Sequence, residues 1–348
     1  MKPAKPFIDR RKHILLLTIM LAAAAPAMIL LACTVGSALI PFADTARETW
    51  RLLMGQTPAN ETYAMILFNL RLPRAVLSYL VGAGLSICGT VMQGIFQNPM
   101  ADPHLLGVSS GAAFGASVGL LMGAGAGLFG LGTTTVLAFA GGIGAVALVH
   151  MLSVQRGKAP TGRLLLSGIA MTSLLSAAIA GMMIFRRDKI ERIVQWTMGS
   201  FTSSNWDKVI AAAIFILPLS LALSLSGKVL NAMALGDEPA NTLGISAETA
   251  RRILLLASTL LTAAAVSVSG IIGFVGLTVP HVIRMLLGGD YRGLLPISFF
   301  TGGLFLCAMD TLARTAVSPL EVPVGILTSL IGGVFFLSLM RRSNKQSL

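Results

Sequence analysis

The chain has 348 residues, of which 55% are hydrophobic and only 11% are charged, and its mean hydropathy is +0.81. Because a soluble domain carries about 25% charged residues, this composition excludes an ordinary soluble protein and indicates a polytopic membrane protein. The net charge of +12 is spread over many short polar segments. It does not form a concentrated basic domain, which argues against a nucleic-acid partner.

Ten continuously apolar segments follow one another, each close to the roughly 20 residues that a spanning helix needs. Because they do not alternate apolar and polar positions, they predict helices and not the strands of a barrel. The first continues apolar past Cys33, beyond the core of a signal peptide, and so predicts an uncleaved span. Only Gly270 separates the seventh from the eighth, so we expect one of these two to be short or re-entrant. The predicted spans are residues 14–40, 72–96, 105–123, 131–153, 163–185, 208–227, 252–269, 271–288, 293–312 and 323–340.

The distribution of charge predicts the orientation. With a cytoplasmic N-terminus and ten spans, the inner segments hold most of the 26 Lys and Arg residues, as the positive-inside rule requires. We therefore expect an all-α fold, a single transmembrane domain over residues 1–348, and both termini in the cytoplasm.

Three connections are too structured to be simple loops. The outer segment 41–71 contains an amphipathic stretch with Trp50, and the outer segment 186–207 carries Trp196 and Trp206, so both are expected to lie at the membrane interface. Basic residues outnumber acidic ones in 186–192, which is either a solvated face or a surface that receives an anionic chelate. The polar inner segment 228–251 has two pieces of helical length and is expected to touch a cytoplasmic partner.

The chemistry of an autonomous pump or enzyme is missing from the sequence. The spans contain almost no ionisable groups, which argues against an ion-coupled secondary transporter acting alone. There is no P-loop and no set of residues typical of an intramembrane hydrolase. The three cysteines, which have no CxxC spacing, predict neither a metal site nor a disulfide. We expect no cofactor and no catalytic residue, so energy for any pumping would have to come from a partner.

Long motifs resemble one known family. The stretch RLPRAVLSYLVGAGLSICGTVMQGIFQNPMADPHLLGVSSGAAFGA (Arg71–Ala116) is similar to the signature region of the FecCD permeases, which are membrane subunits of type II ABC importers for ferric siderophores, haem and cobalamin. LGDEPANTLGI (Leu235–Ile245) resembles the cytoplasmic coupling segment of that family. GIIGFVGLTVPHVIRMLLG (Gly270–Gly288) and the stretch Asp310–Met340 resemble its last three helices.

The resemblance implies a ten-helix permease that works as a homodimer, with two cytoplasmic ATPase subunits below and one extracytoplasmic binding protein above. It implies a bacterial cytoplasmic membrane and ATP-driven alternating access, with hydrolysis by the ATPase and not by this chain. The implied cargo is a metal chelate, with a ferric siderophore as first choice and haem or cobalamin as the alternative.

The resemblance also implies roles for particular residues, each an expectation at this point. The expected binding-protein docking residues at the outer face are Arg71, Arg74 and Arg314. The expected ATPase-coupling residues are Leu235, Gly236, Asp237, Glu238, Ala240, Leu243 and Gly244. The expected cytoplasmic gate is Thr161 and Gly162. The small hydroxyl residues expected to line the path are Ser167, Thr172, Ser173, Ser176, Thr328 and Ser329.

Overall fold

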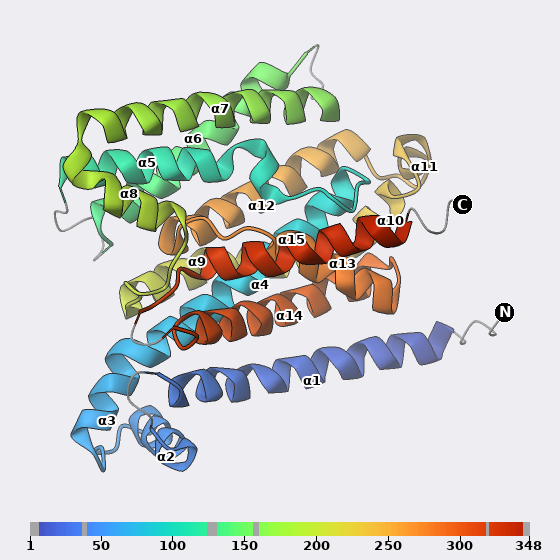
Figure 1. Cartoon of the computed structure of the whole chain (residues 1–348). Helices are drawn as coiled ribbons and strands as arrows, with labels where there is room; N and C mark the ends of the chain where they lie inside the picture. The colour runs from blue at the N-terminus through green and yellow to red at the C-terminus, as the bar shows by residue number, and fades with distance from the viewer. Residues whose placement is uncertain (1–6, 37–39, 124–130, 156–159, 318–319, 344–348) are drawn as a thin grey trace.

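A computed structural model describes residues 7–36, 40–123, 131–155, 160–317 and 320–343, and within these ranges the chain forms helices and no β-strands (Figure 1). Helices are the expected solution for continuously apolar segments, because a helix satisfies its backbone hydrogen bonds internally where lipid offers no partners. The expected all-α fold is therefore confirmed for the described residues.

Each of the ten predicted spans overlaps one of the longer helices. These helices are α1 (Phe7–Thr34), α4 (Leu72–Ile95), α5 (Val108–Met122), α6 (Thr133–Ser153), α7 (Thr161–Phe185), α9 (Trp206–Leu225), α12 (Ala247–Ser269), α13 (Val275–Leu287), α14 (Tyr291–Ala313) and α15 (Val324–Ser343). The short elements between them are α2 (Phe42–Leu53), α3 (Glu61–Ile66), the π-helical turn η1 (Leu67–Arg71), the 3₁₀ turns η2 (Pro103–Leu106) and η4 (Arg187–Lys189), α8 (Ile190–Thr197), α10 (Gly227–Met233) and α11 (Asp237–Thr242).

Seven of the described helical segments are long and apolar enough to cross a membrane, and three further apolar helices, within α5, α13 and α15, are shorter. The short α13 agrees with the expectation for the spans on either side of Gly270. Gly270 has φ +72°, and a Cβ atom there would lie 2.2 Å from the carbonyl oxygen of Trp196. Glycine therefore allows α12 to end and the chain to turn in tight contact with α8. Ten crossings and cytoplasmic termini remain predictions.

Helix α4 forms the centre of the bundle. Nearly all of its residues are buried, and it packs against α9, α12, α13 and α14. Glycines bring these helices close: a Cβ on Gly82 would lie 2.3 Å from the carbonyl oxygen of Gly302 on α14, and one on Gly89 would lie 1.6 Å from that of Gly276 on α13. Backbones that approach this closely are typical of helix packing in membranes.

Helix α7 lies at the opposite edge of the bundle from α1 (Figure 1). Much of its apolar surface is exposed, including Leu166, Ile169 and Leu174, and exposed leucines such as Leu330 and Leu337 also mark α15. The start of α1, the end of α15 and the short helix α11 lie at one end of the bundle, and α2 and α3 lie at the other (Figure 1). In keeping with the predicted topology, these are called the cytoplasmic and the outer end.

Candidate functional site

Arg74, at the start of α4, joins three parts of the outer end. Its Nε and Nη2 atoms donate to the two carboxylate oxygens of Asp310 on α14 at 2.9 and 3.0 Å, and Nη1 donates to Oε2 of Glu321 at 2.8 Å. Thr202 donates a further hydrogen bond to the same Glu321 oxygen at 3.0 Å. We call Arg74, Asp310 and Glu321 the outer clamp, because they hold α4, α14 and the segment that precedes α15 together.

Arg71 and Arg314 bind the end of α1. Nη1 of Arg71 donates to the carbonyl oxygens of Cys33 at 2.7 Å and Thr34 at 3.3 Å, and Nη2 of Arg314 donates to the carbonyl oxygen of Ala32. The last carbonyls of a helix lack intrahelical partners and carry partial negative charge, so cationic side chains stabilise them. The two arginines therefore cap α1 from α14 and from the turn before α4.

The three predicted docking arginines are thus close together, as expected, but their charges already have partners within the chain. Arg71 is only 6% exposed and Arg74 only 9%, whereas Arg314 is half-buried. These contacts within the chain were not predicted from the sequence. The one signal was Asp310, an acidic residue near the end of a predicted span, since a carboxylate at such a place normally has a cationic partner. Docking by the three arginines remains a prediction.

The outer clamp predicts a pH dependence. Burial alone would raise the pKa of Glu321, but the hydrogen bond and charge of Arg74 outweigh it and hold this pKa below its ordinary value. A group whose pKa is lowered in the folded state stabilises fully above its unfolded pKa, about 4.3 for glutamate, and loses that contribution as the pH falls through the folded value. We expect Glu321→Gln to lower the Tm slightly at neutral pH and to match the parent chain only once the pH has fallen below the lowered folded pKa of Glu321, measured by thermal unfolding across pH. A Tm difference that persists in acid would contradict this cause.

The cytoplasmic segment forms a small folded unit. Ala232, Ala240 and Ala247 pack together around α10, α11 and the start of α12, and Asp237 accepts a 2.7 Å bond from Arg251. Leu235 and Leu243, on either side of α11, are 68% and 64% exposed. The other predicted coupling residues lie here too: Gly236 and Gly244 adopt positive φ at the turns, and Glu238 is exposed. The role of this segment in coupling to an ATPase remains a prediction.

Hydrogen bonds connect this unit to the centre of the bundle. Gln97, just after α4, donates to the carbonyl oxygen of Met233 at 2.6 Å. Asn231 donates to Asp290 at 2.7 Å and accepts from the backbone of Tyr291 at 3.0 Å, at the start of α14. These bonds start from α10, against which α11 packs, so a movement of α10 would reach α4 and α14, the same two helices that the outer clamp joins at the other end.

The predicted gate and path residues lie on two helices that remain widely exposed. Thr161 and Gly162 begin α7, and a Cβ on Gly162 would meet no atom within 4 Å. Thr328 is buried, with its hydroxyl bonded to the carbonyl oxygen of Gly325, whereas Ser329 is exposed. On α7, Ser173 and Ser176 are exposed, and Ser167 and Thr172 are half-buried. The roles of these residues in a gate or path remain predictions.

A bundle of apolar helices, joined at its outer end by the buried ion pair of Arg74 and Asp310, indicates a multi-pass membrane protein. Residues 19–342 match the model of the FecCD transport family. The chain belongs to this family and is the permease of a metal-chelate type ABC importer.

Relatives of known or assigned cargo support this membership. The hemin transport system permease HmuU of Yersinia pestis is 43% identical over 83% of this chain and 87% of its own length. The cobalamin import permease BtuC of Halobacterium salinarum is 43% identical over 83% of this chain and 76% of its own. The Fe(3+) dicitrate permease FecD of Escherichia coli is 38% identical over 84% and 90%.

A solved structure gives the same result for the fold. An inward-facing conformation assigned to the metal-chelate type of ABC transporter is 31% identical, with a TM-score of 0.80 over 93% of this chain and 98% of the other. Family membership therefore favours an ABC importer over the ion-coupled carrier that the sequence left open.

Proposed function

We propose that two copies of this chain form the membrane path of an ABC importer in the cytoplasmic membrane of a bacterium. Two cytoplasmic ATPase subunits and one extracytoplasmic binding protein would complete the complex. The observation that carries this proposal is the pair of exposed leucines, Leu235 and Leu243, on a segment hydrogen-bonded to α4 and α14. Such a segment can receive a partner's movement and pass it to the bundle.

The proposed cargo is an iron chelate, with a ferric siderophore first and haem or cobalamin as the alternative. Named relatives transport hemin, Fe(3+) dicitrate and cobalamin, and a molybdate permease is 39% identical over 78% of this chain. The exposed serines of α7 and Ser329 on α15 offer a weakly polar lining between two copies. A lining of this kind holds cargo loosely, so selectivity would rest mainly with the binding protein.

Transport would follow alternating access. ATP-driven closure of the ATPase pair moves α11 together with α10, against which it packs. The hydrogen bonds of Gln97 to Met233 and of Asn231 to Asp290 pass the movement of α10 to α4 and α14.

At the gate residues Thr161 and Gly162, a Cβ on Gly162 would meet no atom of the described residues within 4 Å. The next turn of α7 is held by the buried side chain of Leu164 and by the hydrogen bond from Ser153 to the carbonyl oxygen of Arg163, so a shift there would be confined to the first residues of α7. The outer clamp keeps the outer ends of α4 and α14 in register during the shift.

ATP-driven uptake in proteoliposomes tests the proposed function directly. The liposomes would hold this chain with its ATPase, and the binding protein would be loaded in turn with ferric siderophore, haem and cobalamin. Uptake of one cargo, abolished by an inactive ATPase, would support the importer and identify its substrate. Uptake that continues without ATP and follows an ion gradient would reject it.

The coupling leucines give a sharper test. We expect Leu235→Gln and Leu243→Gln each to weaken ATPase binding about tenfold, because burying an exposed leucine side chain is worth about 1.5–3 kcal/mol. The measurement is ATPase affinity and cargo-stimulated hydrolysis in nanodiscs. Leu286→Gln is the matched control, since Leu286 is equally exposed at the end of α13. Equal losses in all three variants would reject a specific coupling surface.

Docking of the binding protein is proposed around Arg314, the least buried of the three predicted arginines. We expect Arg314→Glu to reduce the association rate of the binding protein at least fivefold at low salt, because rim charges mainly steer encounter. Arg47→Glu, an exposed change on α2, is the control. An association rate that is equal in the two variants and falls equally with salt would move the docking site elsewhere.

A further inference from the structure

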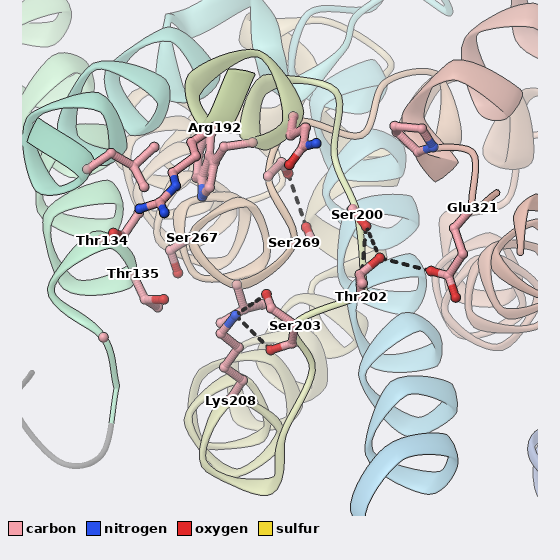
Figure 2. Close-up of a pocket in the computed structure, with 17 residues that line it drawn as sticks. Thr134, Thr135, Arg192, Ser200, Thr202, Ser203, Lys208, Ser267, Ser269 and Glu321 are labelled. Carbon is pink, nitrogen blue, oxygen red and sulfur yellow. Dashed lines mark hydrogen bonds between the residues drawn. The ribbon is translucent and has the colours of Figure 1, made fainter. Parts of the chain in front are cut away.

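A partly open cavity of about 710 Å³, lined by both apolar and polar residues, lies within a single copy of the chain at its outer end. It is bounded by the starts of α6 and α9, the end of α12, helix α8 and the segment before α15 (Figure 2). Its volume lies inside the roughly 300–1,000 Å³ of sites that hold a drug-sized ligand. The proposed function does not use this cavity.

Two basic side chains line the cavity without a carboxylate partner. Among the described residues, Nζ of Lys208 donates to Ser203 alone, to its carbonyl oxygen at 3.0 Å and to its hydroxyl at 2.7 Å. Arg192 makes no ion pair with any described acidic residue, and its side chain is turned toward Thr134 (Figure 2). The one carboxylate in the lining is that of Glu321, and Arg74 already neutralises it. The cavity therefore has an excess of positive charge.

Hydroxyl groups supply the remaining polar lining. They come from the start of α6, the loop between α8 and α9 and the end of α12, and include Thr134, Thr135, Ser200, Thr202, Ser203 and Ser267. Hydroxyls both donate and accept, so they can bind the oxygens of a ligand beside the two cations. Arginine adds a planar pair of donors that matches a carboxylate.

We propose that this cavity binds a carboxylate-bearing chelate as the binding protein releases it. The inference rests on the proposed function and narrows its cargo to anionic chelates. A tricarboxylate with its metal ion suits the volume, whereas a single phosphate would occupy a small part of it. Both cations are partly exposed to solvent, where such contacts are weak and sensitive to salt. Weak binding suits a site that has to pass its ligand onward.

The probe for the test is citrate, added with and without ferric iron. The complex of permease and ATPase would be placed in phosphatidylcholine nanodiscs, and binding measured by titration calorimetry at low and high salt. We expect saturable binding that weakens with salt and is at least tenfold weaker in the double variant Arg192→Gln, Lys208→Gln. The charge-preserving variant Arg192→Lys, Lys208→Arg should retain binding, which separates lost charge from lost folding.

A matched control removes two charges elsewhere at the outer end. The variant Arg47→Gln, Arg187→Gln changes the net charge equally but alters no residue that lines the cavity, so we expect it to bind citrate as the parent chain does. Absence of saturable binding to the parent chain, or equal weakening in this control, would overturn the proposal.

Anionic lipid headgroups could also bind in this cavity, so a separate experiment tests them. Nanodiscs with phosphatidylglycerol should leave citrate binding unchanged; complete loss there would assign the cavity to a lipid headgroup and overturn its role for cargo. Because none of these measurements needs ATP or uptake, they can refute the proposed cavity site without refuting the proposed importer function. Equally, ATP-driven uptake can fail while citrate still binds.

Discussion

Replacing Arg74 by alanine is expected to lower the free energy of unfolding by about 3–5 kcal/mol, because the change leaves the buried carboxylate of Asp310 without its cation. The Asp310 side chain is only 3% exposed and receives both Nε and Nη2 of Arg74. The expected result is a large fall in Tm and in the yield of purified permease, measured by thermal unfolding in detergent.

Two further variants isolate the cause. Glu321→Gln should cost little, because the Glu321 side chain is 41% exposed and water can replace its contact. The double variant Arg74→Met, Asp310→Leu should recover most of the lost stability, since apolar residues of similar volume often replace a buried ion pair without loss. If the double variant is as unstable as the single one, the ion pair is not the source of the effect.

The second large effect is expected at Gly89, where α4 crosses α13. A Cβ atom at Gly89 would lie 1.6 Å from the carbonyl oxygen of Gly276 and 2.6 Å from its Cα atom. Since this obstacle is backbone, the helices have to separate, and overpacking of a core costs about 1–3 kcal/mol or more. We expect Gly89→Ala to prevent stable accumulation of the permease, as measured by its amount in membranes and its Tm.

Gly181→Ala is the matched control for this prediction. Gly181 lies within α7, and a Cβ there would meet no atom within 4 Å. Alanine favours helix over glycine by about 0.8–1 kcal/mol in exposed helices, so this variant should be neutral or slightly stabilised. Equal losses at both glycines would show that the α4–α13 crossing is not specially intolerant.

The helices were largely predictable because their signal is local. Each apolar run of sufficient length contains a helix, and Gly270 marked the break before the short α13. The end of the first span was placed too far along, at residue 40, whereas α1 ends at Thr34. Hydropathy could not locate this end, because the carbonyls of Ala32, Cys33 and Thr34 are capped by Arg71 and Arg314, which are distant in sequence.

The contacts at the outer end were less predictable, because the residues that make them are distant in sequence. Arg74 is separated from Asp310 by 236 positions and from Glu321 by 247, and no pattern within a window of sequence connects them. The charged segment 186–192 was recognised, but not that its Arg192 shares a cavity with Lys208. Family resemblance predicted the coupling segment, and its role remains a prediction. The exposure of Leu235 and Leu243 could be seen only in the fold.

The central position of α4 has a consequence for synthesis in the membrane. Helix α4 emerges early, yet its neighbours α9, α12, α13 and α14 all follow it in the chain. Until these helices insert, α4 exposes polar side chains that are buried in the folded bundle. These side chains are Ser78, Ser86, Thr90 and Gln93, and they contact lipid or the insertion machinery. In a chain truncated before α14, these polar residues of α4 would stay exposed to lipid. Quality-control proteases should therefore degrade such fragments.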